Sequence, residues 1–189
     1  MRKLLLLAQI SLDGYVADKN RSFDHFIGGE ENLSFVCGIT DNADAALLGR
    51  ISYELLDSGW PSAAEKPGAT ENEIRYSNWY NSVPKYVVSG STTKGGSANS
   101  VFINQNIPAA IQQIKETEGK DILLFGSPSL AQYMLHNKLL DGCWIILHPV
   151  LFGDGIPLFG KMPIPLSFRL VQTETLSTGV LVLRYDIVD

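Results

Sequence analysis

The sequence predicts an α/β fold, a three-layer α/β/α sandwich around a mostly parallel mixed sheet with a C-terminal antiparallel hairpin. The 189 residues are 45% hydrophobic and 19% charged, which is ordinary for one globular domain. Short apolar runs alternate with amphipathic segments as far as residue 147, the pattern of parallel strands joined by helices. Two strand-like segments separated by a short turn then end the chain. We therefore expect a single domain over residues 1–189.

Continuous apolar runs predict the strands of the parallel part. Residues 3–10 form the first run, and the absence of alternation is typical of a central strand that is covered on both faces. Further strands are expected at 45–48, 85–89, 101–103, 121–125 and 143–147. The hairpin is expected at 168–173 and 180–187, with Ser177-Thr178-Gly179 between its strands.

Capping signals predict where the helices begin. Thr70 and Glu73 form a capping box, because each can bond the backbone N–H of the other at a helix start. Pro128 follows Ser127, so a capping residue is followed by the residue favoured at the first helical position. Other helices are expected at 31–39, at 50–56 and from 107 onward. The segments 12–21 and 57–69 contain Gly, Pro or Asn turn signals and are expected to be loops.

Charge, cysteine and histidine usage exclude several classes of function. The net charge is −5 and no long basic run occurs, so we expect no nucleic-acid partner. The apolar start runs directly into a polar turn, which predicts a buried strand rather than a signal peptide, and no later segment is long enough to span a bilayer. Cys37 and Cys143 are expected to be free thiols in the cytoplasm. His25, His136 and His148 lack metal-ligand spacing, so no metal site is expected.

Three predicted strands end in segments that suit phosphate groups. Gly49-Arg50-Ile51-Ser52 combines close backbone approach, a helix N-terminus and a guanidinium. Phe125-Gly126-Ser127-Pro128-Ser129 again joins a strand to a helix N-terminus, and Ser89-Gly90-Ser91-Thr92-Thr93-Lys94 offers hydroxyls and a cation for a ribose 2′-phosphate. Each segment alone is equally a surface turn, a helix cap or a polar loop. Together they suggest an extended, multiply phosphorylated ligand such as a dinucleotide.

Four segments carry a resemblance to a known family. They are ISLDGYVA at 10–17, LLGRISYE at 47–54, KYVVS at 85–89, and the stretch 122–159 with its PVLFGDG. In this order they resemble the dihydrofolate reductase-like superfamily, and within it the C-terminal reductase domain of the bifunctional riboflavin-biosynthesis deaminase/reductase. The chain departs from that family at Gly126-Ser127, where Gly-Gly is usual, and at Asp141-Gly142, where Asp-Glu is common.

This resemblance implies NADPH as the cofactor. It implies that the nicotinamide end is bordered by Ala8, Ile10 and Gly14, and that phosphate is held by Gly49, Arg50, Ile51 and Ser52. It also implies that the adenosine ribose and its 2′-phosphate are surrounded by Ser89, Gly90 and Ser91. The pyrophosphate and the nicotinamide ribose are then expected to be covered by Gly126, Ser127, Pro128, Ser129 and Leu130. The resemblance also implies a homodimer, and the apolar strand 143–147 either contributes to such an interface or belongs only to the core.

Candidates for the chemistry itself are few. Hydride transfer also needs a proton, and Asp13 and Asp24 are the nearest candidate donors, although water is an alternative. Trp60 either stacks on a planar substrate or anchors its loop, and His148 is expected to be structural. The leading hypothesis is an NADPH-dependent reductase of a small pterin- or pyrimidine-like heterocycle. The alternatives are a non-catalytic dimer that binds a nucleotide or other ligand on the same scaffold, and a protein that binds flavin or another aromatic ligand in the same cleft.

Overall fold

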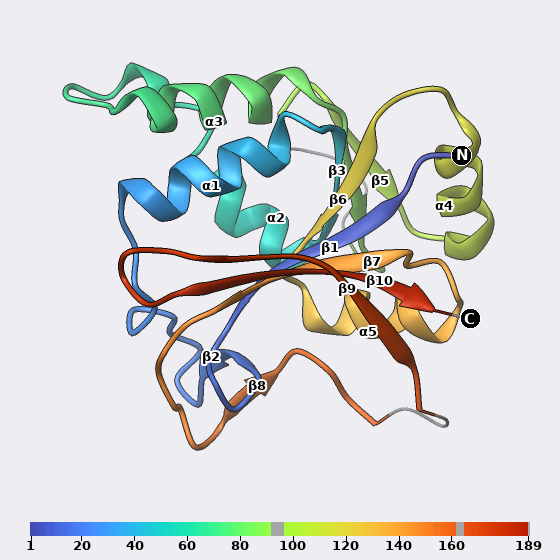
Figure 1. Ribbon diagram of the computed structural model, residues 1–189. Coiled ribbons are helices and arrows are strands. Elements are labelled where there is room, and N and C mark those ends of the chain that lie inside the picture. The colour runs from blue at the N-terminus through green and yellow to red at the C-terminus, as the bar shows by residue number, and fades with distance from the viewer. Residues whose placement is uncertain (92–96, 162–164, 189) are drawn as a thin grey trace. The chain divides into compact units, whose positions relative to one another are not determined.

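The structure is a computed structural model that describes residues 1–91, 97–161 and 165–188 (Figure 1). The chain divides into two compact units. The first comprises Met1–Arg2 and Gly28–Leu123, and the second comprises Lys3–Ile27 and Leu124–Asp189. Both units mix strands and helices, each contains parallel strand pairs, and a C-terminal antiparallel hairpin is present, so the predicted fold class is confirmed. That the chain is a single domain stays a prediction.

The first unit carries a parallel ribbon of strands with helices between them. Its elements are α1 (Glu30–Thr40), β3 (Ala43–Gly49), α2 (Arg50–Asp57), the 3₁₀ helix η1 (Ala63–Glu65), α3 (Glu71–Ser82), β4 (Lys85–Val88), β5 (Ser100–Ile103), α4 (Ile107–Glu116) and the start of β6 (Asp121–Phe125). The strand β4 pairs in parallel with β3 on one side and with β5 on the other. The register sets Gly49 opposite Val88, so β3 and β4 end at the same edge.

Local sequence signals explain the helix α3 and its end. The hydroxyl of Thr70 accepts from the Glu73 N–H at 3.2 Å, and the Glu73 carboxylate accepts from the Thr70 N–H at 2.8 Å, which confirms the capping box. At the other end of the helix the fully buried Lys85 donates to the carbonyls of Tyr80 and Val83 at 2.8 and 3.2 Å. Burial lowers the pKa of this lysine. A cation at these last carbonyls also complements the helix dipole.

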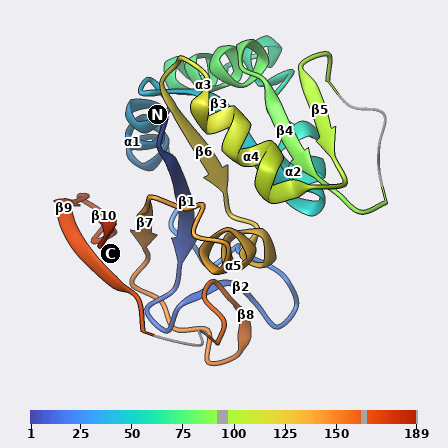
Figure 2. The same ribbon diagram turned by 90° about the vertical axis from the view of Figure 1, so that its right-hand side faces the viewer.

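The second unit contains the first strand and the C-terminal hairpin. Its elements are β1 (Leu4–Ile10), β2 (Tyr15–Asp18), the end of β6, α5 (Pro128–His136), β7 (Gly142–Leu147), β8 (Gly155–Pro157), β9 (Ser167–Thr175) and β10 (Leu181–Val188). The strands β9 and β10 run side by side as the predicted hairpin (Figures 1 and 2).

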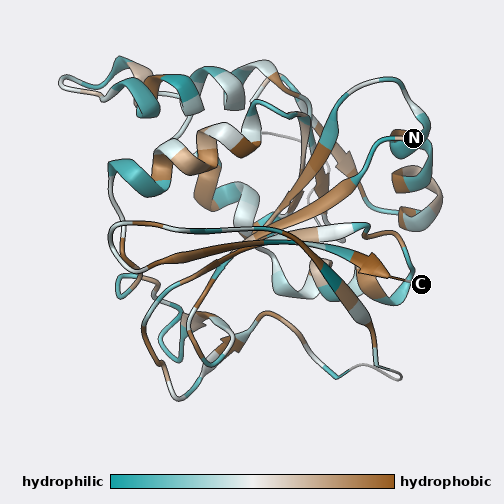
Figure 3. Ribbon diagram, in the orientation of Figure 1, coloured by the Kyte–Doolittle hydropathy of each residue, from teal (hydrophilic) through white to brown (hydrophobic). Residues whose placement is uncertain are grey.

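The strand β1 lies between two others, as its sequence predicts. It pairs in parallel with β7, and on its other side Gly126, directly after β6, donates its N–H to the Leu7 carbonyl at 2.9 Å. The first five residues of β1 are buried, and Figure 3 shows the hydrophobic colour along this strand. An unbroken apolar run is therefore explained by burial on both faces.

The structure corrects the expected loops at two places. Residues 12–21 contain β2, which pairs antiparallel with β8, although neither short strand has an apolar period in the sequence. A side chain on Gly155 would lie 2.2 Å from the Ala17 carbonyl, so only glycine permits this close pairing. The segment 57–69 likewise contains η1. Both are short pieces held by tertiary contacts, which sequence periodicity does not report.

The described residues contain neither a membrane-spanning helix nor a metal-binding cluster. No helix among them has the length and apolar character needed to cross a membrane. Within residues 1–91, 97–161 and 165–188, no group of three or more His, Cys, Asp and Glu side chains is placed to hold a metal ion. Cys37 and Cys143 are both buried free thiols, and burial raises the pKa of Cys143 to about 12.

Candidate functional site

The junction of β3 and α2 in the first unit is open at its helix N-terminus. Gly49 precedes the helix in an extended conformation, no side chain caps the helix, and its first turn contains no acidic residue. The first N–H groups of a helix have no partner within it, so they are available to an anion. Arg50 is exposed, and its Nη1 lies 2.9 Å from both carboxylate oxygens of Glu54. An exposed pair of this kind is weak and can yield to a phosphate.

The end of β4 lies beside this junction. Ser89 is buried, and its hydroxyl accepts from the Ser91 N–H at 3.3 Å, which makes a tight turn with Gly90 exposed at its tip. Because Gly49 is opposite Val88, the structure brings the predicted residues 49–52 and 89–91 to one edge. Lys94, predicted to act with them, lies outside the described residues.

In the second unit the β6–α5 junction has an unusual backbone. Gly126 and Ser127 both adopt a positive φ, of 49° in each case. Ser127 occupies the N-cap position, but its side chain makes no capping hydrogen bond, so its interpretation as a side-chain cap is wrong. A left-handed residue points its side chain differently from the extended residue that normally caps a helix.

The β6–α5 junction has several hydrogen-bond donors. The Gly126 N–H is used by the Leu7 carbonyl, and Pro128 has no N–H. The remaining donors are the N–H groups of Ser127, Ser129 and Leu130, together with the Ser127 and Ser129 hydroxyls. The Leu130 side chain is apolar and buried, so this residue can offer only its N–H. The junction therefore suits a negatively charged group such as a pyrophosphate.

The predicted nicotinamide residues follow on the neighbouring strand. Ala8 is buried near the end of β1, Ile10 is half-buried, and Gly14 sits in the next turn with a φ of 85°. The Gly14 N–H donates to the Ser11 carbonyl at 2.9 Å, which closes this turn. Since Gly126 bonds Leu7, the second unit brings the end of β1 and the start of α5 together.

Asp13 is an anchor of its loop. Its carboxylate accepts from the Ser11 hydroxyl at 2.6 Å and from the N–H groups of Gly153 and Phe152 at 2.7 and 3.2 Å. The Ser11 hydrogen bond, supported by these two N–H groups, lowers the pKa of Asp13 below its ordinary value of 3.8. A group stabilised as the anion is a poor proton donor at neutral pH. These contacts favour a structural role over a catalytic one.

Asp24, a predicted proton donor, and Trp60, a predicted substrate contact, belong to different units. Asp24 is exposed in the second unit, where its N–H donates to the Ser22 hydroxyl at 3.0 Å. Trp60 belongs to the first unit and packs against Tyr76 with ring centroids 4.3 Å apart. The Trp60 carbonyl accepts from the Ser77 hydroxyl at 2.7 Å. These contacts favour its reading as a loop anchor.

His148 is a buried structural histidine, and it engages a residue that the sequence analysis missed. Its Nδ1 accepts from the Ile27 N–H at 3.1 Å, and its Nε2 lies 2.9 Å from Gln9 Oε1. The ring stacks on Phe26 with centroids 4.4 Å apart. Burial lowers the pKa of His148 to about 4. No local pattern connects positions 9 and 148, so only the fold reveals this contact.

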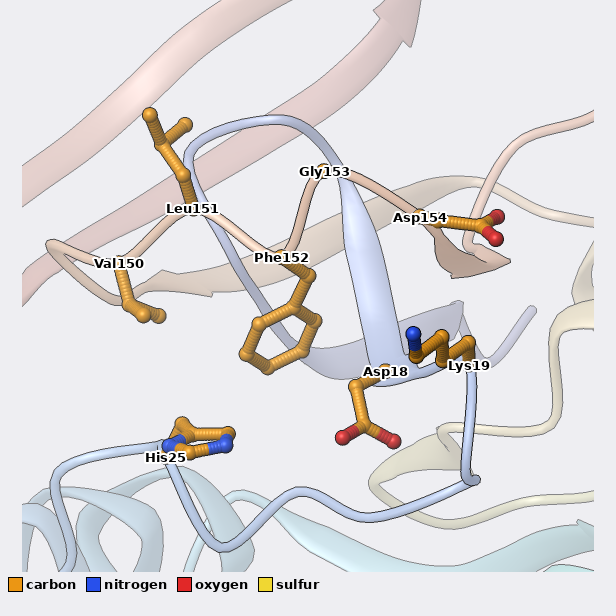
Figure 4. A pocket seen from close by; sticks show the side chains of 8 residues that line it. All are labelled: Asp18, Lys19, His25, Val150, Leu151, Phe152, Gly153 and Asp154. Carbon is orange, nitrogen blue, oxygen red and sulfur yellow. The ribbon is translucent and has the colours of Figure 1, made fainter.

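An open cavity of about 320 Å³ lies elsewhere in the second unit. It is lined by Asp18, Lys19, His25 and residues 150–154, and Figure 4 shows the Phe152 and His25 side chains facing its interior while Leu151 points away. The Asp18 carboxylate accepts from the N–H groups of Asn20 and Ser22, so it serves its own turn. None of the residues predicted to bind the cofactor lines this cavity.

Comparisons with known proteins agree with this architecture. The chain is 30% identical over 187 residues to the uncharacterised protein YyaP of Bacillus subtilis, which covers 97% of this chain and 94% of YyaP. A solved putative riboflavin biosynthesis protein from Shewanella sp. PV-4 superposes with a TM-score of 0.75 at 22% identity and covers 99% of each chain. Dihydrofolate reductase from Enterococcus faecalis, solved with NADP(H), gives a TM-score of 0.63 at 10% identity, covering 99% of this chain and 97% of that one.

These likenesses establish the dihydrofolate reductase-like fold, and a match to a family of reductase domains extends over almost the whole sequence. The family described as the RibD C-terminal domain matches residues 2–182. The chain therefore belongs to the RibD C-terminal domain family.

Proposed function

We propose that the protein is an NADPH-dependent reductase that acts in the cytoplasm on a small pterin- or pyrimidine-like heterocycle. The observation that carries the proposal is that each unit collects predicted cofactor residues at the carboxyl ends of adjoining strands. In open α/β sheets this edge is where ligands bind. Membership in a family of reductase domains supports the same activity.

The cluster in the first unit is suited to the phosphates of the adenosine half. The α2 N-terminus after Gly49 supplies N–H donors and a partial positive charge, and Arg50 adds a full charge. Ser89 and Ser91 form the turn beside it, which suits the ribose and its 2′-phosphate. Arg50 is the only strongly basic side chain in this cluster among the described residues, so it is the group on which phosphate affinity depends most.

The cluster in the second unit is suited to the nicotinamide half. The N–H groups at the start of α5 suit the pyrophosphate, and Ala8, Ile10 and Gly14 border the reacting ring. NADPH would supply a hydride, and the protein must then provide a route for one proton. Because the Asp13 carboxylate is held as an anion, we assign the proton to Asp24 or to water rather than to Asp13.

The second candidate function is a non-catalytic dimer that binds a nucleotide on the same scaffold. The engagement of Asp13 by Ser11, Phe152 and Gly153 favours it, because the nearest carboxylate is then no acid catalyst. The two functions differ in one measurement. A reductase consumes NADPH in the presence of pterin or pyrimidine substrates, which is followed by absorbance, whereas the non-catalytic protein binds it unchanged.

The Arg50→Ala variant tests the assignment of the cofactor. We expect NADPH to bind at least about tenfold more weakly, which corresponds to roughly 1.4 kcal/mol, because one cation is removed from the phosphate cluster. Arg75→Ala is the matched control, since Arg75 is an equally exposed arginine of the same unit that is paired with Asp41. It should leave affinity unchanged. NADH should bind more weakly than NADPH.

Both affinities are measured by titrating the change in NADPH fluorescence. Equal weakening by Arg50→Ala and Arg75→Ala would show that only overall charge matters and would remove Arg50 from the site. If the wild type binds neither NADPH nor NADH, the reductase proposal fails.

A further inference from the structure

The pair His148–Gln9 has a determined hydrogen-bond direction. The Ile27 backbone N–H is only a donor, so His148 Nδ1, 3.1 Å away, must carry a lone pair. The ring proton of the neutral histidine is therefore on Nε2. The fully buried position of the ring opposes a second proton. It follows that Nε2–H donates and that the Gln9 atom 2.9 Å away is the amide oxygen, which accepts.

This direction fixes what Gln9 presents to its surroundings. Its oxygen is engaged by His148, so the other end of the amide is the NH₂ group, with two N–H donors. Gln9 is exposed, and within the part of the chain that the structure describes its NH₂ group has no hydrogen-bond partner. An exposed amide would normally rotate between two nearly equivalent orientations. Here a buried histidine selects one of them.

Gln9 lies at the end of β1, beside which the proposed function places the nicotinamide. It is the penultimate residue of β1, between Ala8 and Ile10, at the strand end that adjoins the β6–α5 junction. The strand is rigid, because β7 pairs along its length and the His148 N–H bonds the Ile10 carbonyl at 2.8 Å. The His148 ring is held in turn by its stack on Phe26. A donor fixed on such a scaffold is pre-organised for recognition.

We propose that the Gln9 NH₂ group contacts the substrate and selects heterocycles that present a carbonyl oxygen there over those that present an amino group at the same ring position. This inference rests on the proposed reductase function. Gln9 contacts the substrate, whereas His148 is a positioning residue that acts through the orientation of the amide. An amino group facing the Gln9 NH₂ would leave two donors opposed and unpaired, which is the basis of the discrimination.

The test compares two ligands that share a pyrimidine ring. Uracil carries carbonyl oxygens at ring positions 2 and 4, where 2,4-diaminopyrimidine carries amino groups. We expect calorimetric titration to show that the wild type binds uracil about tenfold more tightly than 2,4-diaminopyrimidine. A uracil carbonyl can accept a hydrogen bond from the Gln9 NH₂ group, whereas an amino group at the same position opposes it with a second donor. In Gln9→Glu one carboxylate oxygen still accepts from His148 and the other becomes an acceptor, so the preference should reverse.

Variants of His148 test the positioning role. In His148→Ala the amide loses its orientation, and the ratio of the two affinities should fall toward one. In His148→Gln a side-chain N–H can again donate toward Gln9, so the preference for uracil should return. Thermal unfolding verifies that each variant is folded. A purely structural histidine would change stability without moving the ratio.

Two results overturn the proposal. One is an equal ligand preference in the wild type and Gln9→Glu, and the other is a wild type that binds neither pyrimidine. All titrations are repeated with NADPH present, and its fluorescence is recorded separately. If NADPH binds normally but the ratio of the two pyrimidine affinities is the same in the wild type and Gln9→Glu, only the role of Gln9 is contradicted. If NADPH does not bind, the reductase function is contradicted.

Discussion

A single buried histidine connects the segment before α1 to the end of β1. His148 is completely buried, accepts from the Ile27 N–H, donates to Gln9 and stacks on Phe26. The contact with Ile27 requires the neutral ring, because protonation of Nδ1 would oppose the Ile27 N–H donor. The residue that orients Gln9 is therefore also a point at which acid should weaken the fold.

The pH dependence of stability follows from the pKa of His148. The folded protein holds this pKa at about 4, whereas the unfolded chain titrates near its ordinary value of 6.5. As the pH falls from 6.5 to 4 only the unfolded state takes up the proton, so the free energy of unfolding should fall by up to roughly 3 kcal/mol. Above pH 6.5 this contribution is constant.

Urea unfolding at several pH values measures this effect. His148→Gln is the control, because it removes the titrating group and should flatten the profile between pH 4 and 6.5. Asp13, whose pKa is lowered, gives stability that is lost as the pH falls through 3.8 and further, so most of this loss lies below the window of His148. The same slope in the wild type and His148→Gln would mean that other groups cause it.

At the scale of elements, the β6–α5 junction is a helix start with an unusual backbone. Two successive left-handed residues, Gly126 and Ser127, turn the chain, and Pro128 then begins the helix. Glycine adopts such a conformation without strain, which accounts for Gly-Gly in the resembling family. Ser127 is strained there, and strained backbone is characteristic of functional sites.

Replacing Ser127 by glycine should therefore stabilise the protein. The left-handed conformation costs a non-glycine residue about 1–2 kcal/mol, and glycine loses about 0.5–1 kcal/mol more backbone entropy on folding, so a net gain of about 0.5–1 kcal/mol is expected. The N–H donors of the junction remain, and NADPH should bind at least as tightly as in the wild type. The free energy of unfolding and the NADPH affinity are the two measurements.

Ser129→Gly is the matched control. Ser129 is exposed in the first turn of the same helix with ordinary helical backbone, so the same substitution should destabilise the protein by about 0.5 kcal/mol. Destabilisation by Ser127→Gly as well would mean that its left-handed conformation is not strained.

At the scale of the whole molecule, the exposed strand β9 is a better candidate for a dimer contact than the strand β7. The strand β7 pairs with β1 on one side and β10 on the other, and Cys143, Ile145 and Ile146 are buried. These three residues therefore belong to the core of their unit, and whether the strand also contributes to a dimer interface stays a prediction. The strand β9 ends the order β1-β7-β10-β9 in its unit, and its Leu170 and Val171 are 49% and 55% exposed. A long exposed apolar edge strand invites pairing with another chain.

We expect a homodimer that uses β9. Light scattering at micromolar concentration should give about twice the 20.7 kDa of one chain, and Val171→Lys should reduce it to a monomer, because it places a charge on this edge. Val101→Lys is the control, since Val101 is a comparably exposed strand valine of the first unit and should leave the dimer intact. A monomeric wild type contradicts the expectation of a dimer.

The sequence alone determined the fold class and the family. Unbroken apolar runs predicted β1 and β7 because burial on both faces removes alternation, and the Thr70–Glu73 box predicted the start of α3 because capping is local. The resemblance of ordered segments such as 10–17 and 47–54 predicted the family, which the match to residues 2–182 confirms. These features depend on residues close in the chain or on their order along it.

Only the tertiary structure decided which of these residues meet and in what state. Asp13 is read from the sequence as a possible acid, yet N–H groups 139 and 140 positions later hold it as an anion. Gln9 carries no sequence signal, because its orientation depends on His148 and, through it, on the Ile27 N–H. Strand register and buried hydrogen bonds join distant positions, and no local pattern records them.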